Sequence, residues 1–259
     1  METKKYCINC GTQLIGNFCH TCGQKSHVKR ISIKNFFEDY VSRLFGMDTN
    51  FLRTLRDLTF APGKVGNTFV NGNRVKYIGP VGYFFLINTF FILTFSLLDI
   101  DIKTFLTLSS ERIVNAPTLG AKDEALRSSL MGIVSNNLKV LEFLIIPFIA
   151  LWARAFYKKS KLNFFEHSVN ALYVQGHMVF LKITGVFLYK FAGFILNPYL
   201  IFINLLYFIW SCFGFYNVKG IKNIFKSTFL FILSFASFIL FVVITTIVGV
   251  ALFRRITGT

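Results

Sequence analysis

Residues 81–99 read VGYFFLINTFFILTFSLLD, a nearly unbroken run of apolar side chains. Only Asn88 and Thr89 place clearly polar groups near its middle. Runs of about 18 or more apolar residues match the thickness of the bilayer hydrocarbon, so this run predicts a transmembrane helix. The composition agrees, because 54% of the 259 residues are hydrophobic and 15% are charged, whereas an ordinary soluble domain has about 25% charged residues.

Four further apolar segments follow this first span. Together they predict five transmembrane helices, near residues 81–99, 138–157, 168–196, 199–216 and 227–253. The predicted outer loop, 100–137, is neutral, since residues 99–139 contain five basic and five acidic residues. Pro147 lies inside the second span and predicts a kink there. The sequence thus indicates an all-α polytopic membrane protein, with residues 80–259 as a transmembrane helical bundle.

The distribution of basic residues orients these helices. With five spans and the N-terminus inside, nineteen Lys and Arg residues lie on the cytoplasmic side and seven lie outside. This agrees with the positive-inside rule and predicts a cytoplasmic N-terminus. Arg254 and Arg255 are outside in this arrangement. If one apolar segment were re-entrant, four crossings would remain and both arginines would be cytoplasmic.

The N-terminal stretch CINCGTQLIGNFCHTC, residues 7–22, contains two Cys-x-x-Cys pairs separated by eight residues. Zn²⁺ binds four thiolates in a tetrahedron at about 2.3 Å, and a two-residue gap lets one tight turn present both sulfurs of a pair. Gly11 and Gly23 follow the pairs directly, where the turn needs a residue that tolerates positive φ. We therefore predict a zinc ribbon over residues 1–26, with Zn²⁺ bound by Cys7, Cys10, Cys19 and Cys22. The alternatives are a pair of disulfides or four free thiols.

A reducing compartment suits this use of cysteine. Thiolate ligands persist in the cytoplasm and tend to be oxidised outside it, which agrees with a cytoplasmic N-terminus. No cleavable signal precedes the first apolar run, so we expect the ribbon to stay inside. The fifth cysteine, Cys212, lies in an apolar segment and is expected to be a small core residue.

Residues 27–79 are predicted to form a cytoplasmic amphipathic helical segment. Between Ile33 and Phe45, apolar residues recur at the i, i+3, i+4, i+7 spacing of one helical face. A second helix is expected from about Thr49, and Pro62 suits the first turn of a third. Either these helices fold on each other as a small soluble domain, or their apolar faces lie at the lipid boundary with bases towards anionic headgroups. We favour the second interpretation. The bases expected to face lipid are Arg53, Arg56, Arg74, Lys76, Lys158, Lys159 and Lys161.

The third predicted span is the least apolar of the five. At about 100° per residue, one face contains Glu166, Asn170, Tyr173, His177 and Thr184, and the opposite face contains Ser168, Gln175 and Lys182. Ionisable groups in hydrocarbon are costly unless they are paired or wetted, so we expect both faces to look into the bundle. Glu142, near the outer end of the second span, is a candidate partner for Lys182 or Lys190.

Two interpretations of these polar groups remain open. They form a pocket or a proton or ion path, or they form interhelical hydrogen bonds that fix the packing. The candidate intramembrane polar site consists of Glu142, Glu166, Asn170, Tyr173, Gln175, His177 and Lys182.

Four segments resemble a bacterial membrane family known only as a domain of unknown function, family 3667. They are the ribbon through Gln24, residues 54–62, the run FVNGNRVKYIGPVGYFF and the opening NFFEHSVNALYV of the third span. The spacing Gly72-x-Arg74-x-x-Tyr77-x-x-Pro80 is the most distinctive part. The resemblance implies a zinc-ribbon protein with several spans in the bacterial inner membrane. It implies no activity and no catalytic residues.

The motifs favour a binding role over catalysis. The sequence lacks a His-Glu-x-x-His pair, a Gly-x-Ser-x-Gly elbow and a Walker-type loop, so we do not expect an enzyme. The leading interpretation is a membrane adaptor or scaffold that docks an unknown cytoplasmic protein or anionic lipid, because a closed four-cysteine site leaves no position for substrate.

Two alternatives belong to other functional classes. The first is a small transporter or channel that uses the polar face of the third span. The second is a membrane-tethered nucleic-acid binder, which the net charge of +16 suggests. Topology and lipid charge already account for juxtamembrane bases, so the second is the weaker alternative. The sequence indicates no oligomeric state.

Overall fold

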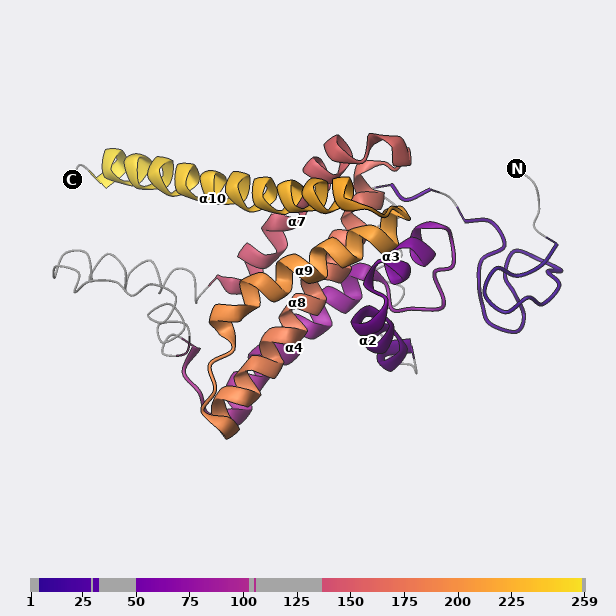
Figure 1. Ribbon diagram of the computed structural model, residues 1–259, viewed down its shortest axis with the longest axis horizontal. Helices are drawn as coiled ribbons and strands as arrows, with labels where there is room; N and C mark the ends of the chain where they lie inside the picture. Colours follow the sequence, from indigo (N-terminus) through magenta and orange to yellow (C-terminus); the bar gives the residue numbers. More distant parts are fainter. Residues whose placement is uncertain (1–4, 29, 33–49, 103–104, 106–136, 258–259) are drawn as a thin grey trace.

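The computed structural model describes residues 5–28, 30–32, 50–102, 105 and 137–257 (Figure 1). Within these residues the chain forms seven α-helices, a short 3₁₀ turn and no β-strand, which confirms the all-α class. The helices are α2 (Asn50–Phe60), α3 (Pro62–Val70), α4 (Pro80–Leu98), α7 (Leu138–Phe156), α8 (Phe164–Ala192), α9 (Asn197–Tyr216) and α10 (Ile221–Thr257). The predicted helix over residues 33–46 and most of the predicted outer loop lie outside the described residues.

Four of the described helices are long and apolar enough to cross a membrane: α4, α8, α9 and α10. Helix α7, the expected second crossing, is not among them. It forms over the predicted residues and continues through Pro147, but it contains three charged residues, Lys139, Glu142 and Arg154. It packs against α8 and α10. Length and composition therefore support four spans, with α7 as a less apolar helix beside them.

The start of α8 differs from the prediction by four residues. The helix begins at Phe164 rather than Ser168, because a capping box precedes it. The Asn163 side chain accepts a hydrogen bond from the Glu166 backbone at 2.9 Å, and the Glu166 carboxylate accepts one from the Asn163 backbone at 2.8 Å. These bonds satisfy two backbone donors at the helix start that have no partner inside the helix. Glu166 thus has a local role at the end of the span.

Helix α10 also begins earlier than predicted. It starts at Ile221, six residues before the predicted span at Ser227. Gly220, with a φ of +93°, lies directly before it and turns the chain into α10. Asn217 caps the C-terminal end of α9 in a left-handed conformation. Glycine and asparagine tolerate such backbone angles better than other residues. The connection between the last two helices is therefore only a few residues long.

Helix α8 occupies the centre of the bundle. One apolar cluster contains side chains of α4, α8 and the α2–α3 pair, and a second contains side chains of α4, α7, α8, α9 and α10. Gly176 lets α4 approach closely, since a Cβ there would lie 3.2 Å from the backbone of Phe84. The two faces of α8 therefore look into two different parts of the interior, and neighbouring helices bury Glu166, Asn170, Gln175 and His177.

Helix α3 is part of the packed interior and does not lie along a lipid boundary. Val65 and Phe69 are buried, and the helix packs against α8 and α9. On α2, Leu58 is buried, whereas Leu52 and Phe60 are largely exposed. The apolar face expected to meet lipid in this segment thus mostly meets protein, and only part of α2 offers apolar side chains outward.

Candidate metal centre and polar interior

The N-terminal ribbon consists of two equivalent knuckles, offset by twelve residues. The Cys7 amide donates to Thr12 O and the Gly11 amide donates to Cys7 O, at 2.8 and 2.9 Å. The same pattern recurs at Cys19, Gln24 and Gly23, with both distances 2.8 Å. An isolated antiparallel bridge closes each knuckle, and both glycines have positive φ, as expected. Each Cys-x-x-Cys pair thus lies on a turn that its own backbone hydrogen bonds hold in shape.

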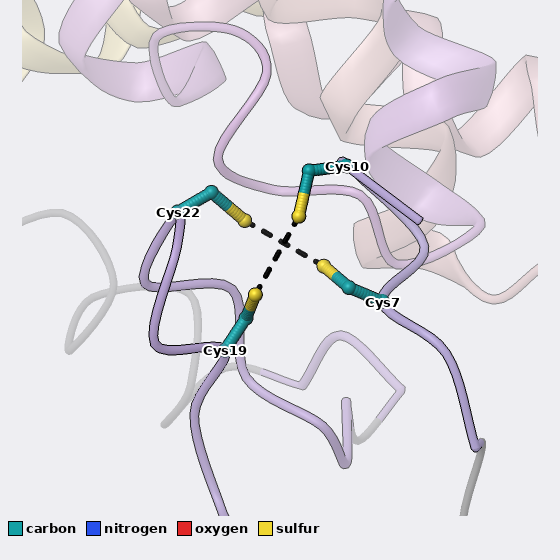
Figure 2. A group of neighbouring side chains, drawn as sticks. All are labelled: Cys7, Cys10, Cys19 and Cys22. Atoms are coloured by element: carbon teal, nitrogen blue, oxygen red, sulfur yellow. Dashed lines mark hydrogen bonds between the residues drawn. The ribbon is translucent and has the colours of Figure 1, made fainter. Parts of the chain in front are cut away.

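The two knuckles bring all four cysteine sulfurs together (Figure 2). Cys7 Sγ lies 3.5 Å from Cys22 Sγ, and Cys10 Sγ lies 3.5 Å from Cys19 Sγ. All four sulfurs lie within 4.8 Å of one another. A disulfide requires about 2.05 Å, so these distances describe free thiols. Four thiolates around one tetrahedral metal at about 2.3 Å lie about 3.8 Å apart, which the cluster matches closely. The cluster can hold a metal ion.

The environments of the thiols differ. Hydrogen bonds with the side chain and backbone of Thr12 lower the pKa of Cys10 to about 6, whereas burial raises the pKa of Cys22 to about 11. Metal ligands must be deprotonated, so binding of a cation would release protons from the cluster.

Gln24 attaches the ribbon to the membrane-proximal loop. Its side chain is 2% exposed. Gln24 Nε2 donates to Gly72 O at 3.0 Å, and Gln24 Oε1 accepts from the Arg74 amide at 3.2 Å. Nearby, Asn73 Nδ2 donates to Asn9 Oδ1 at 3.2 Å. Residues 72–74, part of the most distinctive run in the sequence, therefore form the seat on which the ribbon rests.

Arg30 makes a second attachment, to the start of α8. Its guanidinium binds both carboxylate oxygens of Glu166, at 3.0 and 2.6 Å, and donates to Lys161 O at 2.9 Å. Asn163 Nδ2 donates to Ile31 O at 2.9 Å. Paired guanidinium and carboxylate groups of this geometry are among the stronger hydrogen bonds in proteins. The link after the ribbon is thus fixed to the cap of α8.

One predicted face of α8 forms a satisfied hydrogen-bond network. His177 is buried, with Nδ1 3.0 Å from Tyr83 Oη and Nε2 3.3 Å from Thr59 Oγ1. Tyr207 stacks on the His177 ring, with centroids 5.2 Å apart. These contacts join α2, α4, α8 and α9 around the imidazole. His177 therefore serves the packing of four helices.

Two further residues of this face have similar roles. Asn170 Oδ1 accepts from Ser211 Oγ on α9 at 3.0 Å. Tyr173 Oη donates to Ile78 O at 2.6 Å, just before α4. Thr184 is exposed and bonds back to its own helix. Of the two interpretations, interhelical hydrogen bonds that fix the packing describe this face.

The opposite face of α8 looks into a cavity. Gln175 and Lys182 line a cavity of about 400 Å³ between α7, α8, α9 and α10, together with Glu142 and Asn204. Lys182 Nζ lies 2.5 Å from Glu142 Oε1, so the pairing expected from the sequence is present. Ser168 bonds back to Phe164 O instead. This face thus combines an ion pair with empty space, which the first face does not.

The bases expected to face lipid differ in their exposure. Arg53, Arg56, Lys158, Lys159 and Lys161 are exposed, whereas Lys76 is half-buried with its ammonium over the Tyr77 ring. Arg74 differs from the expectation, because it is 8% exposed and its guanidinium lies 5.6 Å from the Phe69 ring centroid. The close seat of the ribbon on residues 72–74 buries this side chain, so a headgroup does not reach it.

Sequence reasoning missed several residues that this arrangement uses. The sequence places Gln24 within the ribbon motif and Asn204 within an apolar run, and it assigns neither a contact. His167 is buried, and its Nδ1 lies 2.8 Å from Tyr216 Oη. The sequence does mark Asn204, because it is the only amide side chain of α9 after Asn197 at the first position of the helix. Nothing local marked Gln24, because its partners lie about fifty residues away.

The fold and the cysteine cluster define a helical membrane protein with an N-terminal group of thiols able to hold a metal ion. Within this class, residues 48–92 match the family described as Protein of unknown function (DUF3667), which confirms the resemblance noted in the sequence. The matched residues include α2, α3, the seat of the ribbon and most of α4. No curated protein and no solved structure matches the chain.

Proposed function

We propose that the protein is a membrane adaptor, in which a Zn²⁺-closed ribbon at the bacterial inner membrane presents a docking surface to a cytoplasmic protein. A site with four thiolate ligands leaves no open position for substrate, which favours a structural metal. Tetrahedral sulfur ligation is typical of zinc and of iron–sulfur centres, and paired cysteines two to four residues apart are the usual ligands of structural zinc sites.

Exposed apolar side chains on the ribbon are the observation that carries this proposal. Ile15 is 88% exposed and Phe18 is 58% exposed, and Tyr6 is also largely exposed. Apolar groups grouped on one small unit are typical of binding surfaces. The ribbon lies at the edge of the helical bundle, next to α2 and α3 (Figure 1). Gln24 and Arg30 fix its position, so a bound partner would be held at a defined place on the membrane.

The basic loops favour the cytoplasmic side for this surface. Lys161 contacts Arg30 of the ribbon link, and Phe215 at the end of α9 contacts Asn67 of α3. The loops after α7 and α9 therefore meet at the ribbon's end of the bundle. Clustered lysines at one end agree with the positive-inside rule.

Site-specific photocrosslinking tests the adaptor role. A photoreactive residue replaces Phe18 in the full-length protein in native membranes, and Thr21, which is exposed on the same ribbon, is the control position. We expect one discrete protein adduct from position 18 and none from position 21. In a second experiment the photoreactive residue replaces Tyr6. The double variant Ile15→Asp, Phe18→Asp should then give about tenfold less adduct than the same protein without these two changes, while it retains its metal. Adducts with lipid alone, or an unchanged yield, would refute the proposal.

A transporter remains the second candidate, because Gln175 and Lys182 line a cavity. His177, which a path along the first face of α8 would need, is enclosed by Tyr83, Tyr207 and Thr59. The cavity therefore supports binding more directly than passage through the bundle.

A further inference from the structure

The cavity between α7, α8, α9 and α10 has two chemically distinct parts. Nine apolar side chains of α7, α8 and α10 form most of its wall. The remaining four lining residues are polar: Glu142, Gln175, Lys182 and Asn204. Its volume of about 400 Å³ lies in the range of small-molecule binding sites. A wall of this kind suits a ligand with an apolar body and a polar head.

The course of α10 explains why this space exists. Figure 1 shows α10 leaving the direction of α8 and α9, so that its far end lies well away from theirs. Contacts nearer the ribbon end hold α10 to α7, where Trp152 Nε1 donates to Ser237 Oγ at 3.1 Å and Phe148 packs on Phe238. Beyond these contacts α10 diverges from α8 and α9. The ion pair of Glu142 and Lys182 lies on the side of the cavity that α7 and α8 form.

The ion pair is incompletely enclosed by protein. The side chains of Lys182 and Glu142 are 32% and 16% exposed. Glu142 Oε2 and Asn204 Oδ1 are buried and have no hydrogen-bond donor among the described residues. Both oxygens belong to side chains that line the cavity. The last side-chain torsion is broad for Glu and Asn, so rotation about it can present either oxygen to a ligand. The site therefore offers two free acceptors beside one ammonium.

Charge balance selects the kind of head group. An anionic head that pairs with Lys182 leaves the Glu142 carboxylate without its partner, and a cationic head that pairs with Glu142 does the same to Lys182. An unpaired charge in a site of low polarity is strongly unfavourable. A head with one positive and one negative group satisfies both residues. Because the free protein atoms are acceptors, the positive group must donate hydrogen bonds, as a primary ammonium does and a quaternary ammonium does not.

We propose that this cavity binds a zwitterionic amphiphile of the phosphoethanolamine type, with its ammonium on Glu142 and Asn204, its phosphate on Lys182 and its chain along α10. The apolar wall favours a membrane phospholipid over a free zwitterion of the same head-group chemistry. The site is independent of the adaptor role, because neither the ribbon nor residues 72–74 line it.

Native mass spectrometry of the full-length protein, stripped of lipid in detergent, tests this site. The probes are phosphatidylethanolamine, phosphatidylcholine and phosphatidylglycerol with the same acyl chains, and free phosphoethanolamine. We expect the ethanolamine lipid to bind about tenfold more tightly than the choline or glycerol lipid, since only it donates to both acceptors and balances both charges. Tight binding of free phosphoethanolamine would instead identify a water-soluble zwitterion as the ligand and overturn the lipid assignment.

Three variants locate the binding. Glu142→Gln with Lys182→Met removes both charges together and should abolish the preference for the ethanolamine lipid. Val242→Trp fills the apolar part without touching the polar residues and should weaken all lipid binding. Lys190→Met, at an exposed position farther along α8, is the matched control and should behave as wild type. Equal binding of the three lipids by the wild-type protein, an unchanged preference in the double variant, or undiminished lipid binding in Val242→Trp would each sink the proposal.

Discussion

Gln24 shows how one side chain can join two parts of this protein. It donates to Gly72 O and accepts from the Arg74 amide, and it is almost fully buried. In Gln24→Ala, both backbone groups lose their partner, and each buried unsatisfied group costs about 1–3 kcal/mol. We expect faster hydrogen exchange in residues 5–28 with the metal retained, because the four cysteines are unchanged.

The matched control for this change is Gln13→Ala, since Gln13 is an exposed glutamine of the same ribbon. Exchange in Gln13→Ala should equal that of wild type. If both variants exchange at the same rate, Gln24 does not anchor the ribbon.

Asp57 provides a pH-dependent contact beside the same loop. Burial alone would raise its pKa, but the hydrogen bond from Tyr77 Oη at 2.9 Å and the Arg56 guanidinium outweigh burial, so the pKa lies below its usual value of 3.8. A lowered pKa in the folded state stabilises the protein above the unfolded value, and this stability is lost as pH falls through the folded pKa. Thermal unfolding should therefore show a steeper loss of stability below about pH 4 in wild type than in Asp57→Asn.

Tyr77→Phe separates the hydrogen bond from the charge. It leaves Arg56 in place and should shift the acid transition to higher pH, because the Asp57 carboxylate loses its strongest favourable contact. An identical acid profile in wild type and Asp57→Asn would show that this carboxylate does not contribute.

At the level of helices, the contact between α3 and α9 depends on Gly63. A Cβ at this position would lie 2.2 Å from both Phe215 N and Ser211 O, which are backbone atoms that cannot move aside separately. Gly63→Ala should push α3 away from α9, and overpacking of this kind costs about 1–3 kcal/mol or more. Thermal unfolding of the detergent-solubilised protein, followed by circular dichroism, measures the loss.

Gly82→Ala is the comparison, since a Cβ there meets only Ile78 Cγ2 at an ordinary 3.5 Å. Alanine is also the better helix former, so this variant should be as stable as wild type or slightly more stable. Equal destabilisation by both changes would contradict the close approach at Gly63.

The helices show which parts of the fold are readable from local sequence. Apolar runs indicate helices of spanning length, because the bilayer thickness sets that length, and four of the five predicted spans are helices long and apolar enough to cross a membrane. The capping role of Glu166 was not predicted, because the sequence places this residue on the polar face of the third span, whereas its carboxylate closes a capping box with Asn163. The burial of α3 was also missed, since an amphipathic pattern does not say whether its apolar face meets lipid or another helix.

At the scale of the whole molecule, some features of the candidate sites are also readable from local sequence and others are not. The cysteine cluster was predictable, because each pair needs only a short turn and the two turns repeat with one spacing. Pairing of Glu142 with Lys182 was predictable from the cost of leaving either charge alone in hydrocarbon. The cavity and the seat of the ribbon were not, since both depend on how distant segments meet, and neither leaves a periodic pattern in the sequence.

The ribbon and the bundle are joined mainly by polar contacts, through Gln24, Asn73 and Arg30. Among the described residues of the ribbon, the buried apolar side chains are those of Cys7 and Cys19, so the free energy of metal binding should supply most of its folding free energy. We therefore expect Cys7→Ser with Cys10→Ser to release the metal and unfold residues 5–28, while the helical content of the bundle stays unchanged. Elemental analysis and hydrogen exchange on the same sample measure the two effects.

Cys212→Ala, which removes a buried thiol far from the cluster in sequence, should keep both the metal and the ribbon. Full metal content in the double serine variant would eliminate the site, and loss of bundle helicity would show that the two parts fold as one unit.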